Sequence, residues 1–272
     1  MANEQKAILL IGVSGGIGFE VAKRFLKEGY QIFGLDIREP KEKLDGLTFI
    51  KTDITKEKEI VNAFSIVNES GLKLKNIIST AGMYNLDSLV EISEEEFIKM
   101  FDINVFSMYR INKTFLPLLE EHGKIIMISS ELAPLDPLPF TGLYAITKSL
   151  VEKYAYSLRM ELQLLGYKVV LIRPGAIDTG MIDISQESLN RFVEKTEYYK
   201  DNSRKFKHIV VSVENKKIPP SKIANLIYKV SEKRKPKYVY KINRNKSLLL
   251  LNLLPKTLQN RIIKRILTKK SS

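Results

Sequence analysis

The sequence contains no cysteine. This absence excludes disulfides, thiolate nucleophiles, zinc–thiolate sites and iron–sulfur clusters, and it fits a reducing compartment. No apolar run reaches the ~18–20 residues needed to cross a bilayer. Residues 1–6 are short and polar, unlike a signal peptide. We therefore expect a cytoplasmic protein, and we predict no metal site.

Acidic residues are scarce in one region only. Residues 231–272 contain 13 Lys and Arg but a single acid, Glu232, so this segment holds +12 of the net charge of +13. The remaining 230 residues carry only +1. A nucleic-acid groove needs basic residues across the fold. We therefore expect no nucleic-acid partner and treat the basic character as a property of the C-terminal tail.

A glycine-rich turn follows the first apolar run. Residues 7–11 are all apolar, as in a strand buried on both faces, and a helical pattern covers residues 19–27. Between them stands Gly12-Val13-Ser14-Gly15-Gly16-Ile17-Gly18. In a strand–turn–helix unit, backbone N–H groups at the helix N-terminus bind a diphosphate, and missing Cβ atoms let it approach. The turn therefore predicts a dinucleotide site.

A carboxylate at the end of the next predicted strand bears on which dinucleotide binds. That strand covers residues 31–35 and is followed by Asp36, about 20 residues after the glycines. A carboxylate there accepts the ribose 2′-hydroxyl of NAD and repels the 2′-phosphate of NADP. We predict NAD as the preferred cofactor, with NADP as the alternative because Arg38 is close in sequence.

The same turn also has the spacing of a nucleophile elbow, with Ser14 between two glycines. A serine hydrolase is therefore a second interpretation, and it requires an acid and then a histidine later in the chain. The sequence has two histidines: His122 lies just before a predicted strand, and His208 lies in a basic polar stretch. Neither position favours this alternative over the dinucleotide site.

Strands and helices alternate through the rest of the chain. Further strands are predicted at residues 47–52, 76–80, 124–130, 167–172 and 237–242, and helices at 56–68, 93–119, 144–165 and 219–232. Such alternation predicts an α/β fold: a single doubly wound Rossmann-type domain over residues 1–246, with a parallel sheet and helices on both faces. Ligands bind beyond the carboxyl ends of such strands. The glycine turn, Asp36, Asp53, Gly82, Ser130 and Pro174-Gly175 all follow strand ends.

Tyr144 and Lys148 are four residues apart on a predicted helix. Side chains at this spacing lie on one helix face, with Cβ atoms about 5–6 Å apart. The pKa of tyrosine is about 10 in the absence of perturbation, and a nearby positive charge favours the ionised phenol. The pair therefore predicts proton transfer by Tyr144 near neutral pH.

Together these motifs resemble the short-chain dehydrogenase/reductase family. The resemblance rests on Gly12-x-x-x-Gly16-Ile17-Gly18, Asp53, Thr80-Ala81-Gly82, Asn104, Ser130, Tyr144-x-x-x-Lys148 and Pro174-Gly175 with Thr179, in the order of the family. It implies a seven-stranded sheet and hydride transfer between a nicotinamide and an alcohol or ketone. The leucine-rich tail also resembles that of family members acting on retinoids and hydroxysteroids.

The resemblance implies a role for each matched residue. Tyr144 would be the acid/base, Ser130 would bond the substrate oxygen, Lys148 would lower the pKa of Tyr144 and bind the nicotinamide ribose, and Asn104 would hold a water linking Lys148 to solvent. Asp53 would contact adenine. The implied cofactor contacts are Gly12, Ser14, Gly16, Ile17, Gly18, Asp36, Asp53, Ile54, Ala81, Gly82, Lys148, Pro174, Gly175 and Thr179.

Ser129 competes with Ser130 for the catalytic position. Ser130 lies 14 residues before Tyr144, one more than is usual in the family. Because alternate residues of a strand point to opposite faces, only one of the two serines can face Tyr144.

Substrate choice is expected from residues 180–219, which by position resemble the family's substrate loop. Its apolar members include Met181, Ile182, Phe192, Tyr198, Tyr199 and Phe206. They favour a lipophilic substrate with a steroid-, retinoid- or acyl-like skeleton. We expect a homodimer or homotetramer through the two long helices that bear Asn104 and Tyr144. A catalytically silent cofactor sensor is the alternative function, although the Asn, Ser, Tyr and Lys set argues against it.

Residues 247–272 form a basic amphipathic tail. After a leucine run, Leu258, Ile262, Ile263, Ile266 and Leu267 cover one half of a helical wheel, and Arg261, Lys264 and Arg265 lie on the other half. Such a helix can lie on an anionic membrane. The alternative is a helix packed on the substrate mouth or on a partner subunit. Our hypothesis is peripheral membrane contact.

Overall fold

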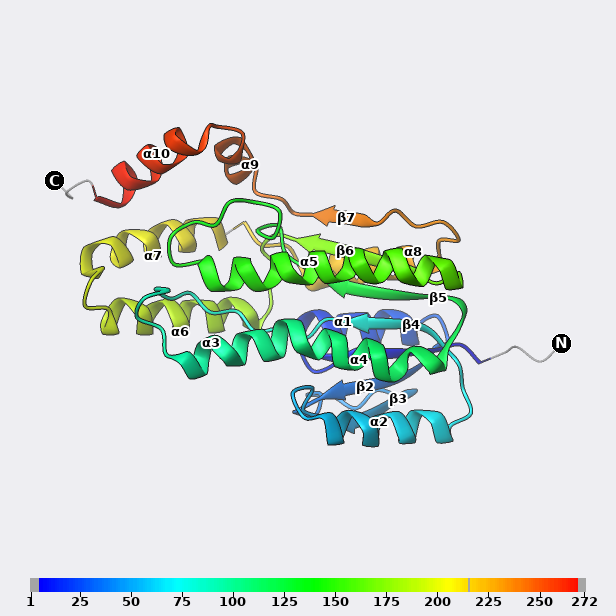
Figure 1. Ribbon diagram of the computed structural model, residues 1–272. Helices are drawn as coiled ribbons and strands as arrows, with labels where there is room; N and C mark the ends of the chain where they lie inside the picture. The colour runs from blue at the N-terminus through cyan, green and yellow to red at the C-terminus, as the bar shows by residue number, and fades with distance from the viewer. Residues whose placement is uncertain (1–4, 215, 269–272) are drawn as a thin grey trace.

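All seven strands are parallel and form one sheet in the order β3-β2-β1-β4-β5-β6-β7. The computed structural model describes residues 5–214 and 216–268. The strands are β1 (Ala7–Ile11), β2 (Gln31–Asp36), β3 (Leu47–Lys51), β4 (Leu74–Ser79), β5 (Leu119–Ile128), β6 (Lys168–Pro174) and β7 (Val239–Ile242). Their arrows all point to the same side in Figure 1. The predicted α/β class and the seven-stranded doubly wound sheet are confirmed.

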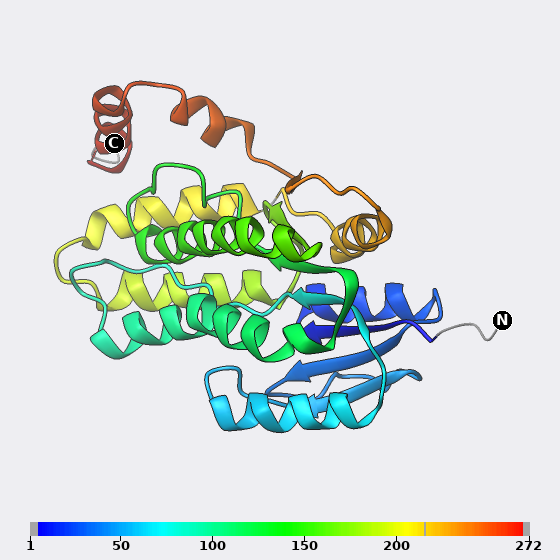
Figure 2. The same ribbon diagram turned by 45° about the vertical axis from the view of Figure 1, so that its right-hand side comes forward.

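Helices cover both faces of the sheet, which explains why β1 is buried along its whole length. One face carries α1 (Gly16–Leu26) and α8 (Pro220–Glu232), whose apolar residues include Phe25 and Ile227. The other carries α2 (Glu57–Glu69), α4 (Ser107–Phe115) and α5 (Gly142–Leu162), with Phe115 and Val151 in the core. Figure 2 shows these layers from a second side.

The strand order reverses between β1 and β4, which are neighbours in the sheet although β2 and β3 lie between them in the chain. From β1 the chain moves to one edge of the sheet, and from β4 it moves to the other. In open α/β sheets the connections diverge at such a point, and ligands bind in the crevice outside the carboxyl ends of the strands. The carboxyl ends of β1 and β4 therefore lie side by side at the edge where the sequence analysis expects its candidate residues.

The helix expected over residues 93–119 is not continuous. The structure has α3 (Glu94–Phe101), a π-helical turn (Asp102–Phe106), α4 and a 3-10 turn (Leu116–Leu118). Ser93 caps the N-terminus of α3, because its hydroxyl accepts the Glu96 N–H at 3.3 Å. The interruption at Asn104 was not predicted. π-helical turns inside α-helices occur frequently at functional sites.

Two further pairs of helices lie outside the layers that cover the sheet: one pair precedes α8 in the chain, and the other follows β7. The segment expected to be the substrate loop forms α6 (Gly180–Lys195) and α7 (Lys200–Glu214), which lie beyond the carboxyl ends of the strands (Figure 1). The tail forms α9 (Lys246–Asn252) and α10 (Lys256–Thr268). Within the described ranges, every helix is too short or too polar to span a lipid bilayer. Of the tail, residues 269–272 lie outside those ranges, as do residues 1–4 of the polar N-terminus and residue 215 of the substrate segment.

Candidate active site

The glycine turn joins β1 to the N-terminus of α1. Gly12 has a φ of +83°, and a Cβ placed on it would lie 2.6 Å from the Ala81 nitrogen. A Cβ on Gly18 would collide with the Gly12 carbonyl oxygen. The close approach of three backbone segments therefore requires both glycines. Helix α1 begins at Gly16, three residues before the predicted start, because these contacts override the low helix propensity of glycine.

The N-terminus of α1 fits an anionic ligand. Its N-cap residue, Gly15, offers no side-chain acceptor to the first helical turn. The first N–H groups of a helix have no partner within the helix and carry a positive partial charge. The N–H groups of Gly16, Ile17 and Gly18 therefore suit the diphosphate of a dinucleotide.

Asp36 lies at the end of β2 and faces the glycine turn. Its carboxylate accepts the Ser14 N–H at 3.0 Å and the Arg38 N–H at 3.3 Å. The Ser14 hydroxyl in turn donates to the Arg38 carbonyl oxygen. The carboxylate is therefore held beside the turn, at the position where a ribose hydroxyl would be recognised. This geometry fits the nicotinamide dinucleotide that the sequence predicts.

Ser14 is not arranged as a nucleophile. His122 lies beside Gly166, with 3.4 Å between its Nδ1 and the Gly166 carbonyl oxygen, at the opposite end of the sheet from Ser14. His208 lies on α7, and the Ser14 hydroxyl is occupied by its bond to the Arg38 carbonyl. The serine-hydrolase alternative lacks the geometry that it needs.

Asp53 and Ile54 follow β3 and are occupied by local structure. One oxygen of the Asp53 carboxylate accepts both the N–H and the hydroxyl of Thr55, at 2.9 and 2.7 Å. Ile54 packs against the hydrophobic core. The adenine contact expected of Asp53 and the cofactor contact expected of Ile54 stay predictions.

Gly82 brings two candidate catalytic groups together at the end of β4. A Cβ on this residue would lie 3.3 Å from Lys148 Nζ and 3.4 Å from Asn104 Oδ1. Just before it, the Ala81 N–H donates to the Ile11 carbonyl at 3.2 Å. The tips of β1 and β4 are thereby fixed beside the crevice.

Asn104 is fully buried in the π-helical turn and uses its whole amide. Its Nδ2 donates to the Met83 carbonyl at 2.9 Å and to the Thr147 hydroxyl at 3.1 Å. Its Oδ1 accepts the Met83 N–H at 2.7 Å. Asn104 therefore clamps the segment after Gly82 to α5. The sequence motifs gave no sign of Met83, and Thr147 was visible only as a residue between Tyr144 and Lys148.

The two neighbouring serines after β5 point in opposite directions. The Ser129 hydroxyl donates to Glu152 on α5 at 2.7 Å, and Glu152 is also bound by Arg173 at 2.6 Å. Ser130 forms a hydrogen bond with the Tyr144 phenol and accepts the Leu132 N–H at 3.2 Å. The serine beside Tyr144 is therefore Ser130, despite the unusual spacing.

Lys148 and Tyr144 are both buried on one face of α5. The Lys148 ammonium donates to the Ile128 carbonyl at 3.3 Å and lies 5.7 Å from the centroid of the Tyr144 ring. Burial lowers the pKa of Lys148 to about 8, because the charged form is poorly solvated. Lys148 therefore holds its proton less firmly than an exposed lysine does.

The same burial raises the pKa of Tyr144 to about 12. The hydrogen bond from Ser130 lowers that pKa and the charge of Glu131 raises it, but desolvation of the phenolate dominates. The expectation that Lys148 would lower the pKa of Tyr144 is therefore wrong in net direction for the protein alone. The spacing of the two residues correctly placed them together but carried no information about their burial.

Glu131 is a buried carboxyl next to this group that the sequence analysis missed. Its Oε2 accepts the Asn245 N–H at 2.6 Å, and its Oε1 would lie 3.0 Å from a Cβ on Gly175. Its own N–H donates to the Pro174 carbonyl at 2.8 Å. Burial raises the pKa of Glu131, with the Asn245 N–H and Arg244 acting in the opposite direction. No local pattern marks a glutamate after Ser130 as buried.

The segment after β6 reaches back to the glycine turn. Thr179 caps α6, and its methyl carbon would lie 2.6 Å from a Cβ on Gly16. A Cβ on Gly175 would collide with the Asn243 carbonyl. The Thr179 side chain therefore packs directly against Gly16 at the start of α1. The cofactor contact expected of both residues stays a prediction.

Apolar side chains surround Tyr144 on the substrate side. Tyr84 packs edge-on against the Tyr144 ring, with 4.5 Å between centroids, and Met100 and Leu143 are buried with them. A second cluster joins the loop before α3 to the helices beyond the sheet; its members include Leu86, Phe140, Phe192, Phe206 and Leu267. The environment beside the phenol is therefore aromatic and aliphatic.

Polar bonds hold α6 over this region. The Ser188 hydroxyl accepts the Leu86 N–H at 3.0 Å, and Lys195 forms an ion pair with Asp87 at 2.6 Å. At the end of the helix, the Thr196 hydroxyl donates to Glu91 at 2.7 Å. Helix α6 is thereby fixed to the segment that follows Gly82.

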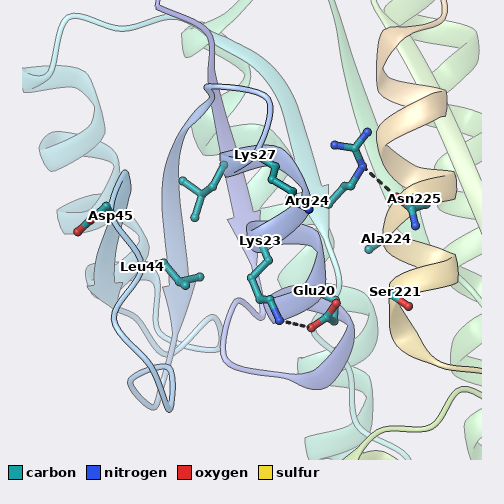
Figure 3. A pocket seen from close by; sticks show the side chains of 10 residues that line it. Glu20, Lys23, Arg24, Lys27, Leu44, Asp45, Ser221, Ala224 and Asn225 are labelled. Carbon is teal, nitrogen blue, oxygen red and sulfur yellow. Dashed lines mark hydrogen bonds and ion pairs between the residues drawn. The ribbon is translucent and has the colours of Figure 1, made fainter.

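A separate hollow of about 490 Å³ lies away from these groups. Figure 3 shows it between α1, the segment before β3, and α8. Its basic residues are partly neutralised, since Lys23 pairs with Glu20 at 2.9 Å and Arg24 with Glu28 at 2.5 Å. None of the predicted site residues lines this hollow, so its size does not identify the active site.

Comparisons with known proteins identify the family of the chain. The model of the short chain dehydrogenase family matches residues 6–190. The 3-ketodihydrosphingosine reductase of Bacteroides thetaiotaomicron is 27% identical over 242 residues, which are 88% of this chain and 88% of that protein. Mouse estradiol 17-beta-dehydrogenase 2 is 32% identical over 190 residues, which are 65% of this chain and half of that protein.

Solved structures share the fold. The crystal structure of 3-ketoacyl-(acyl-carrier-protein) reductase from Brucella melitensis, complexed with NADH, superposes with a TM-score of 0.71 at 20% identity. The match covers 88% of this chain and 97% of that chain. It supports the architecture of the sheet and its helices.

Proposed function

The chain belongs to the short-chain dehydrogenase family, and on that premise we propose that it transfers a hydride between a nicotinamide cofactor and a secondary alcohol or ketone. The observation that carries this proposal is the arrangement of Ser130, Tyr144 and Lys148. The Ser130 hydroxyl bonds the Tyr144 phenol, and Lys148 lies on the same face of α5 beside Gly82. A hydroxyl pair of this kind can hold a substrate oxygen and exchange a proton with it.

The chain's residues would divide the work of cofactor binding. The N–H groups at the start of α1 would hold the diphosphate, and Thr179, which packs against Gly16, would lie beside it. Asp36 would accept the ribose hydroxyls, which favours NAD, while the nearby Arg38 keeps NADP as the alternative. The nicotinamide, when bound, supplies or accepts the hydride.

In ketone reduction, Tyr144 would donate its phenolic proton to the substrate oxygen while Ser130 hydrogen-bonds the same oxygen. Burial raises the pKa of Tyr144 and so keeps the phenol protonated before it donates. The Lys148 ammonium would stabilise the phenolate that remains, because opposite charges attract strongly in a buried site. Asn104 would keep Met83 and Thr147 in register around this group.

We propose a hydrophobic substrate of steroid-, retinoid- or acyl-like skeleton. The support is the apolar setting of Tyr144, formed by Tyr84, Met100 and Leu143, together with the names of the relatives, which act on a sphingoid ketone or a steroid. A sugar would leave its hydroxyls without partners in such surroundings.

We propose a cytoplasmic homodimer or homotetramer that also contacts membrane surfaces. The outer faces of α4 and α5 support self-association because they expose large apolar side chains: Tyr109, Ile146, Leu150, Tyr156 and Met160. Such a patch on a soluble protein marks an interaction surface. Light scattering coupled to size-exclusion chromatography tests this assembly, and a monomer at all concentrations would contradict it.

The activity is tested by oxidised and reduced NAD and NADP, each offered with a panel of steroids, retinoids and simple ketones or alcohols. We expect turnover, followed by nicotinamide absorbance, with NAD preferred and with lipophilic members of the panel favoured. Tight dinucleotide binding without turnover of any substrate class would instead support the catalytically silent cofactor sensor.

A further inference from the structure

The C-terminal arm, residues 246–268, combines exposed leucines with one sign of charge. It contains five cations, Lys246, Lys256, Arg261, Lys264 and Arg265, and no acid. On α9 and just after it, Leu250 is 67% exposed and Leu253 is 82% exposed. Exposed leucines are ordinary when they stand alone, but here they sit in the most basic part of the chain.

Helix α10 has two adjacent stripes of side chains rather than a single apolar half. Residues Gln259, Ile263 and Leu267, four apart, face the body: Gln259 and Leu267 are buried, and Ile263 packs in the cluster with Leu267. The Leu267 carbonyl accepts the Asn202 amide of α7 at 2.9 Å. This stripe fits the alternative of a helix packed near the substrate mouth. It contains two of the five apolar residues of the wheel, Ile263 and Leu267.

The second stripe is only partly covered by the described residues of the chain. It consists of Leu258, Ile262 and Ile266: Ile262 is half-buried, and the two ends are 42% and 52% exposed. Arg261 and Arg265 stand next to it on the wheel, and both are exposed. Within the described residues, one cation of the arm forms an ion pair: Lys256 lies 3.4 Å from Asp136. Arg261, Lys264 and Arg265 have no acidic partner among those residues.

We propose that the arm docks on an anionic lipid bilayer, with Leu250, Leu253, Leu258 and Ile266 entering the boundary between headgroups and acyl chains. The exposed cations of α10 would then contact the headgroups. Charge complementarity selects this occupant, because five cations without a single acid repel a second copy of the same surface. Amphipathic helices rich in Lys and Arg bind such membranes in the interfacial plane.

Because of where the arm lies, its docking would also affect how the substrate reaches the site. This step of the inference rests on the proposed function. Leu267 on the inner stripe shares a cluster with Leu86, Phe192 and Phe206. These residues connect α10 to α6 and α7, which lie beyond the carboxyl ends of the strands (Figure 1). A lipophilic substrate would therefore reach the site directly from the bilayer.

Vesicle flotation of the full chain tests the docking. We expect recovery with vesicles of phosphatidylcholine plus phosphatidylserine, little recovery with phosphatidylcholine alone, and loss of binding as salt is raised. The double variant Leu250→Ser/Leu253→Ser and the triple variant Arg261→Gln/Lys264→Gln/Arg265→Gln should each lower recovery on the order of tenfold.

The matched control is Leu164→Ser/Leu165→Ser after α5, where the two leucines are 82% and 64% exposed but lie outside the arm. It should float like the unmodified chain. Equal recovery of all variants, or no recovery on any vesicle, overturns the proposal. So does a self-association that light scattering detects and that the arm variants abolish, because a second copy would then be the occupant.

Turnover of a water-soluble ketone without vesicles separates the two proposals. The arm variants should retain it, since none of the changed residues lies in the catalytic group. A protein that floats normally but turns nothing over would contradict the proposed function and leave the docking intact.

Discussion

The Glu131 carboxylate accepts the backbone N–H of Asn245 at 2.6 Å. Glu131 directly follows Ser130, and Asn245 is the N-cap of α9. The active site and the C-terminal arm therefore share one buried carboxyl. Its charge raises the pKa of Tyr144. The bond thus gives an electrostatic link between the arm and the phenol.

For Glu131→Gln we expect the pKa of Tyr144 to fall, because the amide keeps an acceptor for Asn245 but removes the negative charge. The limb of the pH–kcat profile that reports Tyr144 should move to lower pH. Glu131→Leu, which also loses the acceptor, should in addition speed proteolysis between β7 and α9. An unchanged profile in Glu131→Gln would show that this carboxyl does not act on the phenol.

Lys148 should contribute to stability in a pH-dependent way. Its folded pKa of about 8 lies below the unfolded value of 10.5, so the unfolded state binds more protons between these limits. The free energy of unfolding should therefore rise with pH through this window, by up to about 3 kcal/mol at 1.36 kcal/mol per unit.

Urea denaturation at several pH values measures this contribution. In Lys148→Met the rise between pH 8 and pH 10.5 should become clearly smaller; Lys124, whose pKa burial also lowers, accounts for part of what remains. Lys153→Met, at an exposed position of the same helix, serves as the control and should retain the full rise. If Lys148→Met kept the full rise, the Lys148 ammonium would not be a buried group that produces it.

Asp36→Asn should change the choice of cofactor. The amide can still accept the Ser14 N–H, but it no longer repels a 2′-phosphate. The ratio of kcat/KM for NAD over NADP should fall by about 10- to 100-fold, the equivalent of about 1.4–2.8 kcal/mol. Asp45→Asn, outside the site, should leave that ratio as it is. An unaltered ratio in Asp36→Asn would remove Asp36 from cofactor recognition.

Asn76 on β4 lowers the stability of the folded protein. It is fully buried, and neither its side-chain nitrogen nor its oxygen has a hydrogen-bond partner among the described residues. Replacing it by leucine removes two desolvated polar groups and should raise the free energy of unfolding by about 1–3 kcal/mol.

Asn112→Leu provides the comparison for this change. The Asn112 amide nitrogen donates to the Tyr154 hydroxyl at 3.2 Å, so the same substitution there loses a bond and should destabilise the protein. Chemical denaturation distinguishes the two. Destabilisation in both variants would indicate that Asn76 has a partner.

Local patterns sufficed to predict the sheet and the group of residues at its rim. An apolar run such as β1 requires burial on both faces, and a turn with Gly12 and Gly18 follows from backbone contacts that admit no Cβ. The alternation of side chains along a strand also separated Ser129 from Ser130, because these preferences operate over a few residues.

Features that depend on distant partners were not predictable. The π-helical turn at Asn104 is accompanied by bonds to Met83, 21 residues away, and Glu131 is buried by the C-terminal segment more than a hundred residues on. Burial also raises the pKa of Tyr144, whereas its spacing to Lys148 predicts a lower pKa. The helical wheel of α10 likewise predicts a single apolar half. In the structure, packing against the body of the protein buries only one side of that half.

The most direct test of the account is the turnover of Tyr144→Phe with a substrate identified on the ketone panel. The change removes the phenolic hydroxyl, which bonds Ser130, and retains the ring that packs against Tyr84. We predict that kcat falls by about 10²- to 10⁴-fold while the Kd for reduced cofactor and the thermal midpoint stay close to those of the unmodified protein. A kcat equal to that of the unmodified protein would contradict the assignment of Tyr144 as the proton donor.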